Sequence, residues 1–410
     1  MKCIFCSMIF SNIDKDISNT KNPKSISGHK FQCNLIDGLL DNGIDLEVYN
    51  TQRISSFPYN SSVVITEKLI EKLNGKGVDI GFINIPIING ITQIVSLKRK
   101  LREAIKKYDG ENIVLLVFNT HYIQSKAVLS MKKEYPHVVT CNVVGDLYGE
   151  HGLKVTSTGL RKIWQSYIEK KQRFLQDKFD KYVLLAPMMQ KALGVKNKDF
   201  VIVEGFYEKY KKKENIVMHD FTNTFDKDAK IIFYAGSLKT AYGIEHLLKA
   251  FRLIKYDNYY LYIAGSGDGE DLIKEYAAKD HRVKFLGILS PHEVLKYQQI
   301  ATVLISPRQS NEDFVKYSFP SKTFECLASG KPYIAHKLPS EPPEYSKYIQ
   351  YPKDESDEAL CNEIIKICEM SEEDRKVIAD SAFNFIANEK NTSVMCKKIV
   401  DLFKASFEEI

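Results

Sequence analysis

No run of about 18 apolar residues occurs anywhere in the 410-residue sequence, so no transmembrane helix is predicted. The apolar start of the chain, MKCIFCSMIF, is short, and polar residues rather than a small-residue cleavage site follow it. We therefore interpret it as a first buried strand and not as a signal peptide. The expected location is the cytoplasm.

The sequence also lacks the dense basic stripe with interleaved aromatic residues that favours nucleic-acid binding. Its net charge is only +6, from 58 Lys and Arg against 52 Asp and Glu. Much of this surplus lies in a predicted surface helix between residues 161 and 181. No nucleic-acid partner is expected. A solvated helix face explains the surplus, and a basic face toward anionic lipid headgroups is the alternative.

Paired cysteine motifs are scarce, although the chain has eight cysteines. Four of them lie in or beside apolar stretches, as reduced and buried cysteines of cytoplasmic proteins do: Cys3, Cys6, Cys141 and Cys326. Cys3 and Cys6 have CxxC spacing, but residues i and i+3 of a strand point to opposite faces, and no second pair follows. No zinc site is predicted.

Apolar segments of strand length alternate with helical segments along the whole chain, which is typical of parallel sheets covered by helices on both faces. In the first half, the predicted strands are residues 2–9, 45–49, 78–83, 113–118, 138–143, 182–186 and 200–203, and the predicted helices include 29–40 and 161–179. In the second half, strands are predicted at 231–234, 259–264, 283–286, 302–306 and 333–335, and helices at 244–254, 269–278, 291–299 and 321–329.

The alternation pauses at residues 205–228, a polar and charged segment that indicates a domain boundary. A chain of this length exceeds what one hydrophobic core usually organises. We therefore predict an α/β protein of two doubly wound domains, residues 1–205 and 206–389, with ligands bound in a cleft between them at the carboxyl ends of the strands. Residues 392–407 have an amphipathic helical pattern.

Two loops that follow predicted strands of the second half are built from small residues. Residues 236–243 lead into a helix, so backbone N–H groups and the positive end of the helix dipole can meet a phosphate there. An ordinary glycine turn explains the same residues equally well. The second loop, residues 265–270, lacks the third glycine of the dinucleotide-binding pattern and indicates only a tight loop near the ligand.

The segment after predicted strand 302–306 contains the most side chains that can bind a phosphate or a ribose. Arg308 lies just past the strand end, where its guanidinium can clamp a diphosphate with two hydrogen bonds. Farther on, Ser321 and Lys322 begin a helix, and Glu325 lies one turn later on the face of Ser321. A carboxylate so placed can accept two hydroxyl groups of a ribose. The alternative is a capped helix with a solvated Lys322 and Glu325.

Residues 232–251 (IFYAGSLKTAYGIEHLLKAF) and the order of motifs through 261–336, which closes with FPSKTFECLASGKPYIA, resemble the GT-B glycosyltransferases of the large retaining family 4. The proline-serine-lysine motif places the resemblance in one branch of that family. It implies a GT-B fold of two Rossmann-like domains and transfer of a sugar from a nucleotide diphosphate sugar. It also implies that these residues bind the donor: Gly236, Ser237, Gly287, Ile288, Ser321, Lys322, Thr323 and Glu325.

By the same resemblance, Glu325 binds the donor ribose, and the backbone of Gly287 and Ile288 meets the base. Ser321, Lys322 and Thr323 lie by the diphosphate. The last helix, within residues 390–410, is expected to pack back on the first domain.

The first half resembles the family more loosely. Gly28 fits the region where the first helix faces the cleft, and Asp146 belongs to a segment (VGDL) that is similar to the family's His-Asp-Leu, with Gly145 in place of the histidine. His121 follows strand 113–118 and is either an acceptor-side histidine or a loop histidine without a role. Asp180 fits a structural aspartate at a strand start.

The chain departs from the family pattern at three positions. Ser237 and Tyr242 stand where the family often has an arginine and a lysine at the diphosphate, and Tyr317 stands where it often has a glutamate near the donor sugar. We infer that the phosphate charge falls instead on Arg308 and Lys322. These two are the predicted catalytic residues, with His121 as a further candidate.

A departing nucleotide diphosphate gains negative charge as the glycosidic bond breaks, and fixed cations and helix N-termini stabilise that charge. In a GT-B enzyme they can replace a metal ion. Two Asp-x-Asp pairs have metal-like spacing, Asp14 with Asp16 and Asp226 with Asp228, but both lie in polar loops. No metal and no other cofactor is expected.

We therefore predict a hexosyltransferase-type glycosyltransferase of polysaccharide biosynthesis that acts with retention. A glycan or lipid-linked oligosaccharide is the expected acceptor, on fold analogy alone. For the cytoplasmic location expected above, the alternative is peripheral contact with the inner face of the membrane. Two alternatives stay open. One is a nucleotide-sugar 2-epimerase-like enzyme. The other is a non-catalytic partner subunit, which the residues at 237, 242 and 317 favour.

Overall fold

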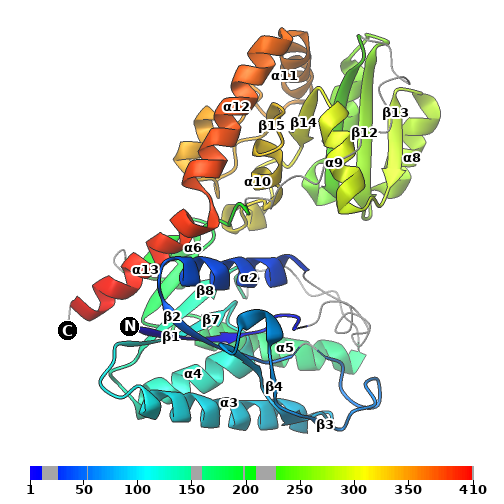
Figure 1. Cartoon of the computed structure of the whole chain (residues 1–410). Helices are drawn as coiled ribbons and strands as arrows, with labels where there is room; N and C mark the ends of the chain where they lie inside the picture. Colours follow the sequence, from blue (N-terminus) through cyan, green and yellow to red (C-terminus); the bar gives the residue numbers. More distant parts are fainter. Residues whose placement is uncertain (12–25, 53, 149–158, 197–198, 209–227, 409–410) are drawn as a thin grey trace. The chain divides into compact units, whose positions relative to one another are not determined.

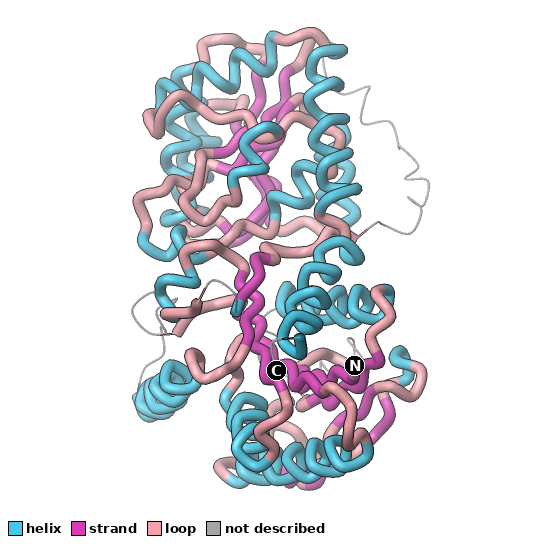
Figure 2. The backbone as a smooth tube through the Cα atoms, turned by 90° about the vertical axis from the view of Figure 1, so that its left-hand side faces the viewer, coloured by secondary structure: helices cyan, strands magenta, loops and turns pink. Residues whose placement is uncertain are grey.

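The computed structural model describes residues 1–11, 26–52, 54–148, 159–196, 199–208 and 228–408. The chain divides into two compact units, Met1–Phe206 with Thr392–Ile410, and Tyr207–Asn391. The sequence predicts this division after residue 205, with a returning segment from residue 390. In each unit the strands form a central layer between helices (magenta and cyan in Figure 2). Most of the predicted boundary segment, residues 209–227, lies outside the described residues.

An eight-stranded sheet organises the N-terminal unit (Figure 1). Its order is β10-β9-β8-β7-β1-β2-β5-β4, and all neighbouring strands run parallel except β4 and β5. The strands are β1 (Lys2–Ser7), β2 (Asp45–Asn50), β4 (Lys68–Leu69), β5 (Gly77–Asp79), β7 (Ile113–Phe118), β8 (Val139–Val144), β9 (Lys181–Leu184) and β10 (Phe200–Ile202). A separate antiparallel pair joins β3 (Val64–Ile65) to β6 (Phe82–Ile83).

Helices cover the N-terminal sheet, and its central strands are buried along their whole length. These helices are α2 (Ile26–Asp41), α3 (Ile88–Lys107), α4 (Tyr122–Glu134), α5 (Gly159–Leu175), α6 (Met189–Leu193) and α13 (Thr392–Glu408), with a 3-10 turn η1 (Glu71–Leu73). Every residue of β1, β7 and β8 is buried. Parallel strands covered on both faces are apolar throughout, which is why these three were readable in the sequence.

The C-terminal unit is built on a five-stranded parallel sheet of order β13-β12-β11-β14-β15. The strands are β11 (Lys230–Ser237), β12 (Tyr259–Ser266), β13 (Val283–Gly287), β14 (Val303–Ser306) and β15 (Tyr333–Ala335). The helices are α7 (Ile244–Leu253), α8 (Glu270–Lys279), α9 (Pro291–Ile300), α10 (Lys322–Leu327), α11 (Asp357–Glu369) and α12 (Glu372–Glu389), with 3-10 turns η4 (Thr240–Tyr242), η5 (Asp313–Tyr317) and η6 (Pro343–Lys347).

Two apolar clusters lie on the two faces of this sheet. Alternate residues of β11 serve alternate clusters: Ile232 packs with α7, α8 and α11, whereas Phe233 packs with α9, α10 and α12. Alternation of side chains along a strand is what allows helices to cover both faces. The predicted doubly wound arrangement is therefore confirmed in this unit.

One predicted strand is wrong. Residues 78–83 do not form a single strand, because β5 ends at Asp79 and β6 begins at Phe82 in a different sheet. The Asp79 carboxylate accepts hydrogen bonds from Ser11 and from Asn50 Nδ2, at 2.6 and 2.7 Å, which holds the chain at the end of β5. Gly81 then crosses close to another segment: a Cβ there would lie 3.0 Å from the backbone N of Glu67.

All eight cysteines are free thiols. Cys3 and Cys6 are both buried in β1, and burial raises the pKa of the Cys3 thiol to about 12 and that of Cys6 further still. Buried thiols of this kind are inert packing residues. Within the described part of the chain, none of the helices combines the length and apolar character needed to cross a bilayer.

The returning helix α13 completes the core of the N-terminal unit. Met395, Cys396, Ile399 and Phe403 are fully buried in the same cluster as β1 and α2. The contact with α2 is close at Gly38, where a Cβ would lie 2.8 Å from Cβ of Cys396 and 2.9 Å from Cγ2 of Thr392. Glycine thus lets the two helices approach.

We expect Gly38→Ala to lower the free energy of unfolding by about 1–2 kcal/mol, because overpacking outweighs the gain in helix propensity. The matched control is Gly90→Ala in α3, where a new Cβ would meet nothing within 4 Å. That change should raise stability by up to about 1 kcal/mol. Urea unfolding of both variants measures the difference. Equal effects of the two substitutions would contradict the close packing of α13 on α2.

Candidate functional site

The loops at the carboxyl ends of β11 and β12 pack tightly on each other. Gly265 has φ 138°, and a Cβ there would overlap the Gly236 carbonyl oxygen. A Cβ on Gly269 would lie 2.7 Å from the Leu238 carbonyl oxygen, which accepts a 2.8 Å hydrogen bond from the Gly269 N–H. The glycines of residues 265–269 therefore support the β11 loop, and the sequence-based description of a tight loop holds.

The end of β11 itself combines exposed and half-buried positions. Ser237 is exposed, and Gly236 is half-buried beside the Tyr234 ring. The Tyr234 hydroxyl donates a 2.8 Å hydrogen bond to the Ser237 carbonyl oxygen. Beyond it, the Thr240 N–H donates to the Asp268 carboxylate at 2.7 Å, so the turn that leads to α7 is fixed from the neighbouring loop.

Arg308 is the main charged group at this edge of the sheet. It follows β14 and is 8% exposed. Its guanidinium carbon lies 4.4 Å from the centre of the Tyr242 ring and 4.9 Å from that of Phe314. No carboxylate within the described residues forms an ion pair with it, and burial lowers the pKa of Arg308, with Tyr242 partly offsetting the effect.

A buried cation without a carboxylate is costly, because desolvation is not repaid by an opposite charge. Stacking on aromatic rings recovers part of that cost. The rings supply no opposite charge, so the positive charge of Arg308 is not neutralised by a carboxylate among the described residues. Tyr242, a departure from the family pattern, here positions the cation instead of supplying one.

Glycine also fixes the position of Arg308. Gly243 has φ 83° and immediately precedes α7, and a Cβ there would overlap the Pro307 carbonyl group. On the other side, Gln309 Nε2 donates to the Glu355 backbone oxygen at 3.0 Å, and the Ser310 N–H donates to the Glu355 carboxylate at 2.9 Å. The loop after β14 is therefore held between the start of α7 and the segment that precedes α11.

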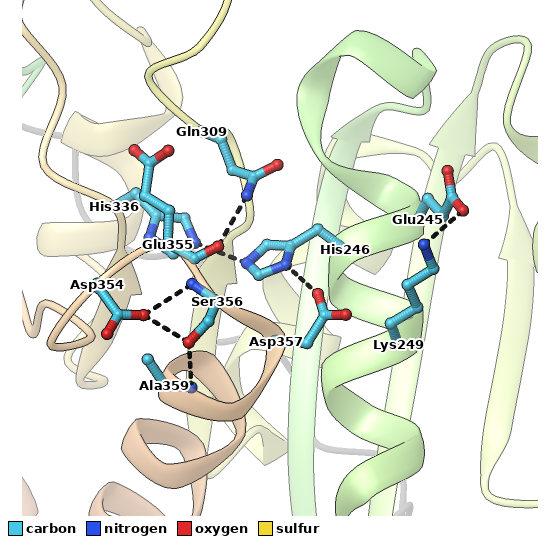
Figure 3. Close-up of polar contacts among 10 residues, drawn as sticks. All are labelled: Glu245, His246, Lys249, Gln309, His336, Asp354, Glu355, Ser356, Asp357 and Ala359. Carbon is cyan, nitrogen blue, oxygen red and sulfur yellow. Dashed lines mark hydrogen bonds and ion pairs between the residues drawn. The ribbon is translucent and has the colours of Figure 1, made fainter.

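Two buried histidines connect the same elements (Figure 3). His246 in the first turn of α7 makes a 2.5 Å contact through Nδ1 with Asp357 at the start of α11, and Nε2 contacts Nε2 of His336 at 2.9 Å. Because a carboxylate accepts, Nδ1 of His246 carries a proton and donates it to Asp357. Burial and the neighbouring His246 lower the pKa of His336 to about 4, so it is neutral at pH 7.

In the predicted proline-serine-lysine segment, some side chains lie at the surface and others in the core. Lys322 and Glu325 are exposed and form an ion pair of 3.3 Å across one helical turn, and Ser321 is exposed at the helix start. Thr323 instead points into the core, where its hydroxyl bonds the buried Tyr333 phenol. The helix α10 is shorter than predicted, ending at Leu327.

Gly287 and Ile288 lie at the end of β13, the edge strand of the sheet. Gly287 has φ 67°, and Ile288 is 79% exposed. An isoleucine that stays so exposed beside polar loops offers an apolar surface for a flat ligand.

In the N-terminal unit, Asp146 is fixed by the loop that carries His121. Asn119 accepts from the Asp146 N–H at 2.8 Å and donates to its carboxylate at 3.0 Å. Asn119 and Thr120 both adopt positive φ, 57° and 46°, immediately before His121 at the start of α4. Such backbone conformations cost energy and concentrate at functional sites. Gly28 lies in the first turn of α2, where its carbonyl oxygen accepts from Gln32 Nε2.

In the described ranges, no group of three or more His, Cys, Asp or Glu side chains is placed to hold a metal ion. Of the two Asp-x-Asp pairs, Asp14, Asp16 and Asp226 lie outside the described residues. Asp180 accepts from the Thr140 N–H and hydroxyl, both at 2.8 Å, in a structural contact between β8 and β9.

Comparison with known proteins links this architecture to sugar transfer. Residues 218–384 match the family model described as glycosyl transferases group 1. No curated protein sequence matches the chain significantly.

Three solved structures illustrate the likeness. They are sucrose-phosphate synthase from Thermosynechococcus elongatus (14% identity, TM-score 0.64, 100% of both chains), a glycosyltransferase from Rickettsia africae (14%, 0.65, 100% of both chains) and HepE from Anabaena in complex with UDP (13%, 0.62, 99% of this chain and 100% of that one).

These matches settle the fold and support the predicted class of enzyme. The fold is GT-B, with two Rossmann-like domains, as the sequence predicted. The family match in the C-terminal half, together with this fold, supports a hexosyltransferase-type enzyme.

The buried histidine pair gives a pH-dependent prediction. The pKa of His336 is about 4 in the folded protein and near 6.5 when unfolded, so below pH 6.5 the unfolded chain binds a proton that the folded chain does not. Stability is therefore lost as the pH falls, by about 2 kcal/mol between pH 7 and 5 through this residue.

Urea unfolding at pH 7 and 5 measures this loss. His336→Gln should reduce the difference between the two pH values, whereas His292→Gln, which changes an exposed histidine of α9, should not. An unchanged pH dependence in His336→Gln would show that His336 is not held neutral.

Proposed function

We propose that the chain is a glycosyltransferase that transfers a sugar from a nucleotide diphosphate sugar, with its donor site at the carboxyl ends of β11, β13 and β14. The observation that carries the proposal is Arg308, a buried guanidinium beside two aromatic rings with no carboxylate partner among the described residues. A diphosphate supplies the missing negative charge and accepts two parallel hydrogen bonds from a guanidinium.

The chemistry follows from where charge develops. When the bond between the anomeric carbon and the diphosphate oxygen breaks, negative charge grows on the leaving diphosphate. A cation that is already in place stabilises this charge without reorganisation, and more strongly in a desolvated site. Arg308 is such a cation, because the rings of Tyr242 and Phe314 hold it and exclude water.

Lys322 and Glu325 supply the second half of the proposed donor site. Their 3.3 Å ion pair is exposed, so it contributes little to stability and can open at little cost. In the donor complex, Glu325 accepts the two ribose hydroxyls and Lys322 turns to the diphosphate. Gly287 and Ile288 present backbone groups and an apolar surface to the base.

The family, the stereochemistry, the metal requirement and the acceptor are proposed from the sequence resemblance. We propose a retaining enzyme of family 4 that needs no metal ion and serves polysaccharide biosynthesis, with a glycan or lipid-linked acceptor at the cytoplasmic membrane face. The structure of HepE contains UDP, which favours a uridine nucleotide as the first donor to test. On the acceptor side, Asp146, His121 and Gly28 are the proposed contacts.

Arg308→Gln should weaken binding of UDP or of the preferred nucleotide sugar by roughly tenfold to a hundredfold, the effect of losing hydrogen bonds from a charged group. Titration calorimetry with a panel of nucleotide diphosphates and nucleotide sugars measures this. The same variant should unfold at an equal or higher temperature without ligand, because an unpaired buried charge is removed. Lower affinity with lost stability would instead indicate a structural role.

Glu325→Ala should weaken binding of the same nucleotide by about tenfold, because two hydroxyl hydrogen bonds of the ribose are lost. Glu275→Ala is the matched control, since Glu275 forms a comparable exposed ion pair with Lys279 in α8. Binding that is unaffected by Glu325→Ala would remove the ribose role. Binding of no nucleotide by the folded wild type would contradict the donor site and favour a non-catalytic partner subunit.

A further inference from the structure

The N-terminal unit exposes an unusual number of large apolar side chains in one region. Six of them define what we call the isoleucine surface: Phe57, Val64, Ile83, Ile87, Ile91 and Val95. Ile87 is 74% exposed, and Val64 and Val95 are each 62% exposed. Single exposed apolar residues are common, but a gathered set marks an interaction site.

Backbone contacts bring these side chains together. Val64 and Ile83 are directly opposite in the β3–β6 pair, so both point to the same exposed face. The Asn84 backbone joins two further segments, because its oxygen accepts from the Phe57 N–H at 3.0 Å and its N–H donates to the Val63 oxygen at 2.7 Å.

The start of α3 is tied to the same structure. The Thr92 hydroxyl donates to the Ile83 backbone oxygen at 3.3 Å, and Asn89 Nδ2 donates to the Ser56 hydroxyl at 2.8 Å. The buried Asn84 side chain also donates to the Ser55 and Ser62 backbone oxygens, at 3.1 and 3.2 Å. The isoleucine surface is therefore built on a hydrogen-bonded frame.

Helix α3 has two apolar faces, and only one of them serves the core. Leu97, Leu101 and Ile105 are buried, and α3 packs on α4 and β6. Ile91 and Val95 are four residues apart on the other face and stay exposed. Just before the helix, Ile87 adopts φ 71°, which β-branched residues rarely do, with its side chain in solvent.

Basic residues continue the exposed face of α3. Lys98, Arg102 and Lys106 follow Ile91 and Val95 at helical spacing; Lys98 and Arg102 are half-buried and Lys106 is exposed. Arg102 pairs with Glu134, whereas Lys98 and Lys106 form no ion pair among the described residues. Residues 57–107 hold nine Lys and Arg against four Asp and Glu, a surplus of five in a chain of net charge +6.

We propose that the isoleucine surface docks on an anionic lipid bilayer. Isoleucine, valine and phenylalanine side chains enter the boundary between headgroups and acyl chains, and the basic end of α3 lies on the headgroups. Charge complementarity favours lipid over a second copy of the chain, because two copies would bring like charges together. The proposal does not depend on the proposed donor site, since it concerns residues of the N-terminal unit alone.

The test uses the full chain and sedimentation with vesicles of phosphatidylcholine, alone or mixed with an equal part of phosphatidylglycerol. Wild type should bind the mixed vesicles, and binding should weaken as salt is raised. The double variant Ile87→Ser with Ile91→Ser should bind roughly tenfold or more weakly, because two apolar side chains no longer enter the bilayer.

Two further variants separate apolar from electrostatic contributions. Lys98→Gln with Lys106→Gln should weaken binding to the mixed vesicles by about tenfold. Val377→Ser is the matched control, because Val377 is 69% exposed on α12 in the other unit, and its loss should leave binding unchanged. Thermal unfolding checks the fold of each variant, and UDP titration reports separately on the donor site.

Three results would overturn the proposal. Wild type could leave both kinds of vesicle unbound. The isoleucine double variant could bind as wild type does. Light scattering could show a wild-type dimer that the isoleucine double variant loses, which would assign the surface to a second copy of the chain.

Discussion

The charge of one buried guanidinium explains how the C-terminal unit is arranged around its sheet edge. Arg308 is desolvated, and neutral rings rather than a carboxylate surround it. The loop that carries Arg308 is held from two sides: Gly243 lets the β14 loop cross the start of α7, and Glu355 holds that loop from the other side. The anion site proposed above requires that the groups which position Arg308 do not themselves neutralise its charge.

At the carboxyl ends of its strands, the N-terminal unit has carboxylates that already have hydrogen-bond partners. There Asn119 pairs with Asp146, and Asn50 and Ser11 pair with Asp79, so the carboxylates are already satisfied by neutral donors. Such networks orient side chains without creating a demand for a counter-ion. The two units thus share a parallel-sheet design but differ in the partners of the charged groups at their strand ends, which are polar side chains in one unit and chiefly aromatic rings in the other.

Sequence patterns located most strands because parallel strands buried on both faces are apolar without interruption, as in β7 and β15, whose limits were predicted to the residue. The pattern failed at β5 and β6, where an apolar run conceals a change of sheet. Arg308 was identified from its place after a strand. Its aromatic partner Phe314 was not, because spacing does not show how the η5 turn folds back on Arg308. The pair of His246 with His336 was not either, because a contact across 90 residues leaves no local signal. Thr323 illustrates the same limit, since spacing cannot show which helical residue turns inward.

The return of α13 to the N-terminal unit has a consequence for synthesis. Strand β1 belongs to the same apolar cluster as Met395, Cys396 and Phe403, so that core needs residues from both ends of the described chain. The C-terminal unit lies wholly between them, and a 2.9 Å hydrogen bond from the Tyr207 N–H to the Lys390 oxygen joins its first residue to a residue next to its last. On the ribosome, the unit encoded second can therefore complete its core first, while the unit encoded first waits for the last helix to emerge.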